Sequence, residues 1–202
     1  MTWNSDEVSV QTLKAGELGT ITTFLDMRDR PTPAPLPPSP LRLVRWKPVD
    51  LGKYRILFER IGGPWLWFSR LIMSDSELRA IVADPGLEVF AVEDPKGIEV
   101  GMLELDFREA GDCELSYLGL VPELAGRGQG KWLMAEALTR AWRPETARVH
   151  VHTCTLDHPA ALRFYRNSGF TVRGQAVETF PDPRLKGFLS RECAPHVPLR
   201  ED

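Results

Sequence analysis

Three glycines at alternate positions stand between an apolar run and a helical pattern. The apolar run, Leu118 to Val121, is typical of the end of a buried strand, and the proline after it stops a strand ladder. Beyond Gly126, Gly128 and Gly130, apolar residues recur at helical spacing from Leu133 to Trp142. Glycines let a ligand approach the backbone, and a helix N-terminus carries partial positive charge. The spacing therefore predicts a loop that binds phosphate.

Two common phosphate-binding loops do not fit this stretch. A Walker loop needs a hydroxyl after Gly130-Lys131 and an earlier glycine, but Trp132 and Ala125 occupy those positions. The dinucleotide fingerprint needs its third glycine where Lys131 stands. The sequence therefore argues against a P-loop nucleotide hydrolase and against a Rossmann enzyme.

Two motifs in this order resemble the GNAT superfamily of N-acetyltransferases. Leu120-Val121-Pro122 followed by Gly128-Gln129-Gly130 is similar to the acyl-CoA loop of that family, although Ala125 stands where Gln or Arg is usual. The run ALRFYRNSGF, residues 161–170, is similar to the family's closing helix. The resemblance covers roughly residues 75 to 180. The alternative is a plain strand–turn–helix unit whose glycines only cap the helix.

The resemblance implies a mixed α/β fold. In that fold a mostly antiparallel, twisted sheet has a parallel strand pair splayed around the cofactor, with helices on both faces. It also implies acetyl-CoA as co-substrate, held by the strand end, the glycine loop and the closing helix, with a histidine where relatives have Asn. The residues expected to contact acetyl-CoA are Leu118, Leu120, Val121, Gly126, Arg127, Gly128, Gln129, Gly130, Lys131, His158 and Tyr165.

Acyl transfer to an amine also needs a proton donor and a proton acceptor. By its place in the closing motif, Tyr165 is expected to be the general acid, because a phenol carries its proton at neutral pH; a hydrogen bond to the cofactor is the alternative. Glu114 is the first candidate base and shares a strand face with Leu118 and Leu120 unless a bulge intervenes. Glu104 on the neighbouring strand is the rival. Either carboxylate could instead bind the acceptor's ammonium or be a surface charge.

The acceptor is expected to be a primary amine of a small molecule or peptide. In relatives the loop between the first two helices often lines the acceptor site, and here that loop contains Trp65, Trp67 and Phe68. Packing over the core is the other fate of such aromatic residues. The second functional hypothesis is a catalytically idle acyl-CoA-binding or regulatory domain, and Tyr165 with the acidic strand residues favours the enzyme.

His150, His152 and Cys154 alternate along one predicted strand and have zinc-ligand chemistry. The polar side of a half-open sheet is the stronger explanation, so we expect no metal. Three cysteines do not indicate a disulfide framework, which favours a reducing, cytoplasmic setting.

The overall composition is that of an ordinary globular protein. A net charge of −3 argues against a nucleic-acid binder that works by bulk attraction. No apolar run approaches a membrane span, and the N-terminus lacks the features of a signal peptide. The sequence does not decide between a monomer and a homodimer.

The predicted elements form one catalytic domain over residues 41–190 with a tail at 191–202. Residues 1–40 form an extension outside the usual core, with short strands at 8–13 and 20–25 and a proline-rich connector at 31–40. We expect a loosely ordered, proline-rich end after the last strand. The remaining prediction is a strand from 41, helices at 51–61 and 75–83, strands at 87–92, 99–107 and 113–121, the loop helix, a strand at 148–155, a helix from 159 and a strand or hairpin from 171.

Overall fold

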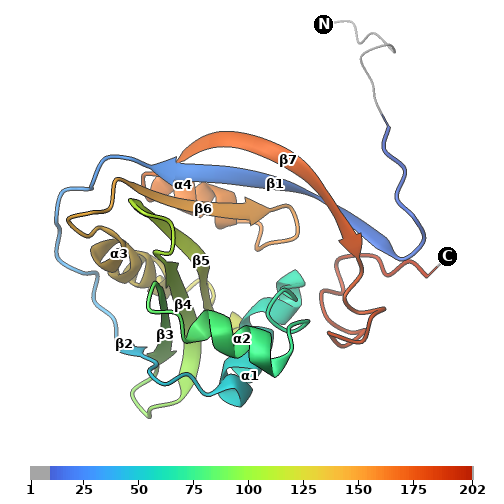
Figure 1. Cartoon of the computed structure of the whole chain (residues 1–202), viewed down its shortest axis with the longest axis horizontal. Helices are drawn as coiled ribbons and strands as arrows, with labels where there is room; N and C mark the ends of the chain where they lie inside the picture. Colours follow the sequence, from blue (N-terminus) through green and yellow to red (C-terminus); the bar gives the residue numbers. More distant parts are fainter. Residues whose placement is uncertain (1–9, 202) are drawn as a thin grey trace, which may run out of the picture.

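The fold is built on one seven-stranded sheet, seen in a computed structural model that describes residues 10–201 (Figure 1). The strand order is β2-β3-β4-β5-β6-β1-β7. All neighbouring strands are antiparallel except the parallel pair β5–β6. The strands are β1 (Glu17–Met27), β2 (Arg42–Arg45), β3 (Leu87–Glu93), β4 (Glu99–Asp106), β5 (Asp112–Leu120), β6 (Arg148–Cys154) and β7 (Thr171–Pro181).

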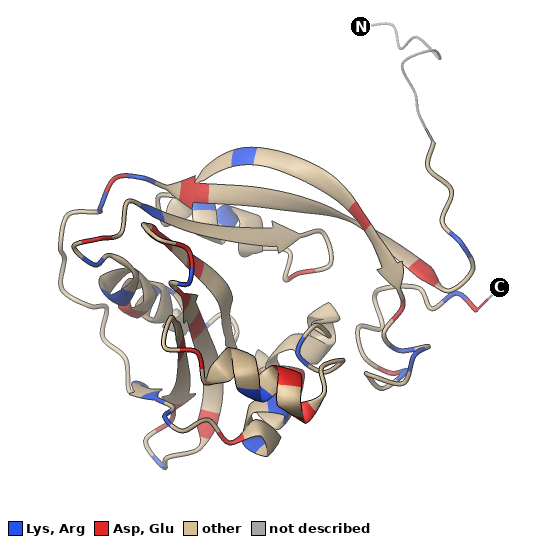
Figure 2. Ribbon diagram, viewed as in Figure 1, with Lys and Arg blue, Asp and Glu red and all other residues tan. Residues whose placement is uncertain are grey.

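Helices cover both faces of this sheet, as predicted. One hydrophobic core contains the buried side of α3 and residues of α4, and the other contains α1 and α2. Lys and Arg are interspersed with Asp and Glu along the ribbon (Figure 2). The helices are α1 (Leu51–Gly62), α2 (Asp75–Val82), α3 (Gln129–Ala141) and α4 (Ala161–Asn167), with short 3-10 turns η2 (Gly63–Trp65) and η3 (Pro122–Leu124).

The starts of the helices predicted at 51–61 and 75–83 are confirmed, and a side-chain cap precedes each one. The Asp50 side chain accepts a hydrogen bond from the backbone N–H of Lys53 at 3.0 Å. Ser74 and Glu77 form a reciprocal capping box at the start of α2. These local bonds satisfy N–H groups that a helix leaves free at its first turn.

The N-terminal strand differs from the prediction. The structure has one strand, β1, and it lies inside the sheet, antiparallel to β6 on one side and to β7 on the other. Residues 10–13 are not in a strand, and residues 8 and 9 lie outside the described part of the chain. Between the buried Leu18 and Leu25, the buried positions of β1 are threonines such as Thr20 and Thr22, so hydrophobic alternation did not reveal its full length.

The segment after β7 is also packed, contrary to the expected loose end. Arg184 and Asp182 form a buried ion pair at 2.7 Å. The same guanidinium donates to the backbone carbonyl of Val197 at 2.9 Å. Leu189 and Ala194 are buried in a small hydrophobic cluster that β1 and the turn after η2 complete. An arginine that bonds several carbonyls orders this segment without regular secondary structure.

A bulge in β5 changes which residues share a face. The pairing with β4 shifts between Leu115 and Tyr117, which leaves Ser116 as the extra residue. The last leucines of β5 therefore pack on the α3 side together with Leu115. Leu118 and Leu120 therefore do not share a strand face with Glu114, and the bulge allowed for in the prediction is present.

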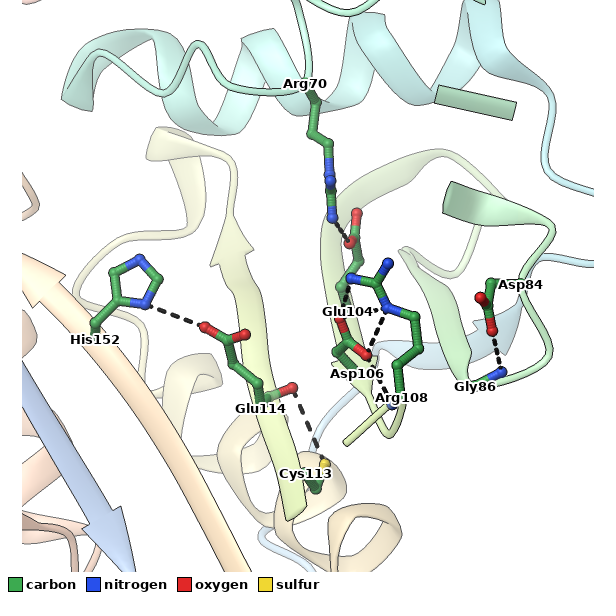
Figure 3. A network of polar contacts seen from close by, with 9 residues as sticks. All are labelled: Arg70, Asp84, Gly86, Glu104, Asp106, Arg108, Cys113, Glu114 and His152. Atoms are coloured by element: carbon green, nitrogen blue, oxygen red, sulfur yellow. Dashed lines mark hydrogen bonds and ion pairs between the residues drawn. The ribbon is translucent and has the colours of Figure 1, made fainter. Parts of the chain in front are cut away.

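A buried ion pair joins the loop after η2 to the centre of the sheet (Figure 3). Arg70 donates to the carboxylate of Glu104 at 2.9 Å, and Glu104 is fully buried. The hydroxyl of Tyr54 on α1 donates to the other carboxylate oxygen. Burial raises the pKa of the Glu104 carboxyl, and Arg70 and Tyr54 offset only part of that rise. Removing Arg70 would leave the Glu104 charge without a counter-ion in the core.

We expect Arg70→Met to lower the free energy of unfolding by about 3–5 kcal/mol, because it leaves the Glu104 carboxylate buried and unpaired. The double variant Arg70→Met, Glu104→Gln should recover part of this loss. As a control, Arg42→Met breaks an exposed pair with Glu93 and should cost at most about 1 kcal/mol. Urea unfolding measures all three, and a double variant no more stable than Arg70→Met would contradict the assignment.

Candidate active site

The first cavity, of about 400 Å³, lies between the end of β5, the glycine loop and α4. Its walls combine apolar side chains with the bare backbone of the three loop glycines. Most of the residues predicted to contact acetyl-CoA line it. These are Leu118, Leu120, Val121, Gly126, Gly128, Gly130, His158 and Tyr165.

The glycine loop leaves its backbone open to this cavity. Gly126 and Gly128 have φ values of +72° and +75°, and a Cβ at either would meet no atom within 4 Å. Among the described residues, none accepts a hydrogen bond from the backbone N–H of Gln129 or Gly130, which begin α3. Free N–H groups at a helix N-terminus beside an open backbone fit a phosphate group.

Three predicted cofactor residues do not line the first cavity. Arg127 is exposed on the loop, and Lys131 is exposed in the first turn of α3. The carbonyl oxygen of the Gln129 side chain accepts a hydrogen bond from Ser39 at 2.5 Å. This bond ties the proline-rich connector to the start of α3. The structure therefore gives Gln129 a contact that the family motif did not indicate.

The second cavity, of about 260 Å³, lies against one face of β6, β1 and β7 and is closed from the other side by the loop after α1. Trp65, Trp67 and Phe68, predicted to meet the acceptor, all line it. Thr22 of β1 also lines it, and its hydroxyl is buried without a hydrogen-bond partner in the described part of the chain. Sequence analysis did not single out Thr22, because the register of β1 was unknown.

The two cavities share part of their walls. The shared residues come from η2 and the turn after it, from β5, and from the β6–α4 connection with α4. They are Trp65, Trp67, Leu118, Asp157 and Tyr165. Ligands in the two cavities would therefore approach each other next to Tyr165.

Tyr165 combines burial with a free hydroxyl. The residue is 9% exposed and packs against Phe164 and Phe170. Burial raises the pKa of the phenol, and the nearby Asp157 raises it further, so the hydroxyl keeps its proton at neutral pH. No hydrogen bond engages that hydroxyl within residues 10–201. It is available to donate to a group in either cavity.

Asp157 fixes the shared wall of the two cavities and does not cap α4. Its carboxylate accepts hydrogen bonds from the Trp67 indole at 3.1 Å, the Thr153 hydroxyl at 2.7 Å and the backbone N–H of Cys154 at 3.0 Å. The N-cap of α4 is Ala160, which makes no side-chain cap bond. Asp157 thus joins the aromatic loop to the end of β6.

Glu114 lines neither cavity but contacts a residue that does. Its Oε1 lies 3.2 Å from Nδ1 of His152, and His152 lines the second cavity (Figure 3). The hydrogen bond from His152 lowers the pKa of Glu114, and the same bond raises the pKa of His152. With its proton on Nδ1, the neutral ring leaves Nε2 free to accept another, and Nε2 points away from Glu114. Sequence analysis considered His152 only as a metal ligand or a polar strand residue.

Glu104, the rival base, lines neither cavity because it is buried in the ion pair with Arg70. No group of three or more His, Cys, Asp or Glu side chains within residues 10–201 is arranged to hold a metal ion.

A sequence model of the Acetyltransferase (GNAT) family matches residues 57–170, more than half of the chain. The chain belongs to the GNAT family of acetyltransferases. Acetyl transfer is therefore the general activity of its family. No curated protein matches its sequence. No helix among the described residues is long and apolar enough to cross a membrane.

Solved GNAT structures share the fold at low sequence identity. A GCN5-related N-acetyltransferase from Sphaerobacter thermophilus is 19% identical with a TM-score of 0.58, over 80% of this chain and 51% of that one. This chain thus spans about half the length of that protein. A dodecameric spermidine N-acetyltransferase from Vibrio cholerae is 21% identical with a TM-score of 0.53, over 76% of this chain and 98% of that one.

We expect Gly128→Val to abolish CoA binding, because its side chain would fill the open space above the loop backbone. Gly97→Val is the matched control, since Gly97 has a similar φ of +81° and equally open surroundings in the β3–β4 turn. Both variants should lose roughly 1–2 kcal/mol of stability from backbone strain. Calorimetry with CoA separates them, and equal affinity in the two variants would refute the assignment of the loop.

Proposed function

We propose that this protein is an N-acetyltransferase that moves an acetyl group from acetyl-CoA to a primary amine by direct attack. The observation that carries the proposal is the shared wall of the two cavities, where Tyr165 faces both. One cavity suits the co-substrate and the other the acceptor. Two substrates that meet directly need no covalent enzyme intermediate.

The fit to acetyl-CoA rests on the glycine loop and the apolar cavity below it. The N–H groups at the start of α3 would bind the pyrophosphate, and the end of β5 would line the pantetheine arm. Acetyl-CoA would supply an activated acetyl group as a thioester. The exposed Arg127 and Lys131 would add positive charge near the phosphates without lining the cavity.

Two protons must move for the reaction to balance. The C–N bond to the acceptor forms, the C–S bond breaks, the amine loses a proton and the sulfur gains one. His152 would accept the amine's proton at Nε2, directly or through water, and Tyr165 would donate its hydroxyl proton to the sulfur. Glu114 would act as a positioning residue, because it orients His152 and stabilises the protonated ring.

Cys154 is the residue that a covalent mechanism would need, since it lines the second cavity. Burial and the nearby Asp157 raise the pKa of its thiol, which keeps the thiolate population low at neutral pH. This favours direct attack by the amine. The alternative function, an idle acyl-CoA-binding domain, predicts CoA binding without thiol release over a broad panel of primary amines.

We expect Tyr165→Phe to reduce kcat by roughly 10²–10⁴-fold, because it removes the proton donor and keeps the ring. Affinity for CoA and the melting temperature should stay near the wild-type values. Tyr54→Phe is the control: its hydroxyl bonds Glu104 in the core, so its loss should lower the melting temperature and leave kcat unchanged. A kcat within about threefold of wild type in Tyr165→Phe, with chemistry rate-limiting, would exclude the acid role.

The pH dependence of kcat/KM tests His152 as the base. A base works when it is unprotonated, so kcat/KM should rise with pH through the raised pKa of His152, above the ordinary 6.5. Glu114→Gln removes the carboxylate that raises this pKa, so the acidic limb of the profile should move to lower pH. Glu145→Gln, a control at an exposed residue that lines neither cavity, should leave the profile unchanged. An unmoved limb in Glu114→Gln would contradict the pairing, and unchanged activity in His152→Gln would exclude His152 as the base.

A further inference from the structure

The second cavity contains a carboxylate, on another strand than the proposed base, that the proposed mechanism does not use. Glu178 of β7 lines this cavity. We propose that the acceptor carries a second cationic group, which Glu178 binds while the reacting amine lies beside Tyr165 and His152. The inference rests on the proposed function, and it names the acceptor class as a diamine or another primary amine with a distal positive charge.

The sheet order sets the distance between these two ends. The cavity begins at the end of β5, crosses β6 and β1 and reaches β7. Glu178 pairs in register with Thr20, and Thr22 pairs with Cys154, so these side chains share one face. Neighbouring strands lie about 4.8 Å apart, which places β7 roughly 10 Å from the strand of His152. An acceptor that contacts both His152 and Glu178 must extend across β1, the strand between them.

The carboxylates around the cavity have different partners. Asp157 is occupied by three hydrogen-bond donors, and Glu114 is paired with His152. Within the described part of the chain, no hydrogen bond or ion pair engages the Glu178 carboxylate, and the residue is exposed at the β7 end. An unpaired carboxylate at the end of a cavity is a binding position for a cation.

The remaining walls of the second cavity suit an uncharged chain. Phe180 stacks near Phe68 with ring centroids 5.0 Å apart, and both line the cavity beside Trp65 and Trp67. The Thr20 hydroxyl is engaged with Thr155 at 2.8 Å. Aromatic faces pack against methylene groups and also attract cations. The arrangement fits an aliphatic spacer with one positive charge at its far end.

The test compares a homologous series of α,ω-diamines with n-alkylamines of the same chain length, by thiol release from acetyl-CoA. At the best length, wild-type protein should show a KM for the diamine about three- to fivefold below that for the monoamine, as expected for a solvent-exposed ion pair. Glu178→Gln should bring this KM ratio near one. Added salt should do the same, since it screens exposed charges. The control Glu145→Gln, which removes an exposed charge away from both cavities, should keep the wild-type ratio.

Equal KM values for diamine and monoamine at every chain length would overturn the inference while leaving the N-acetyltransferase proposal standing. A preference for diamines that Glu178→Gln does not reduce would also overturn it. If calorimetry shows CoA binding but no amine of either series or of a broad primary-amine panel is acetylated, the proposed function fails and the inference fails with it.

Discussion

The early separation of β5 from β6 is the constraint on which the site depends. The two strands pair in parallel only from Asp112 to Glu114, opposite Arg148 to His150. Beyond Glu114 and His150 the two strands no longer pair with each other. The backbone N–H and C=O groups on their facing edges must therefore bond to water or to a ligand. The first cavity occupies the β5 side of this gap, and the second crosses to β6 and continues to β7. The bulge at Ser116 lies at the same place and turns the end of β5 toward α3.

Several contacts hold the two halves of the molecule across this gap. Asp157 joins the end of β6 to Trp67, and Glu114 joins β5 to His152. On the β5 side of the gap, Arg70 fixes the loop beside the second cavity to the buried Glu104. Each is a charge-assisted hydrogen bond, and the buried pair is the most costly to break. These polar contacts therefore determine the shape of both cavities as much as the apolar cores do.

Local signals in the sequence predicted most of the fold. Asp50 and Ser74 began helices, and the glycine loop preceded α3, because capping and glycine chemistry act over a few residues. The position of β1 could not be predicted, because threonines at its buried positions hide the alternation and its partners are distant in sequence. The closing motif predicted that Tyr165 lies at the site. The positions of His152 and Glu104 relative to the site could not be predicted, because they depend on strand register and burial.

The central position of β1 has a consequence for how the chain assembles. Strands β3, β4 and β5 are joined by short turns and pair with sequence neighbours, so they can form as soon as they are synthesised. β1 leaves the ribosome first, yet its partners β6 and β7 come more than a hundred residues later. Closing so long a loop is entropically costly and slow. The half of the sheet that carries the second cavity should therefore be the last to fold, and until then β1 needs protection from other exposed strands.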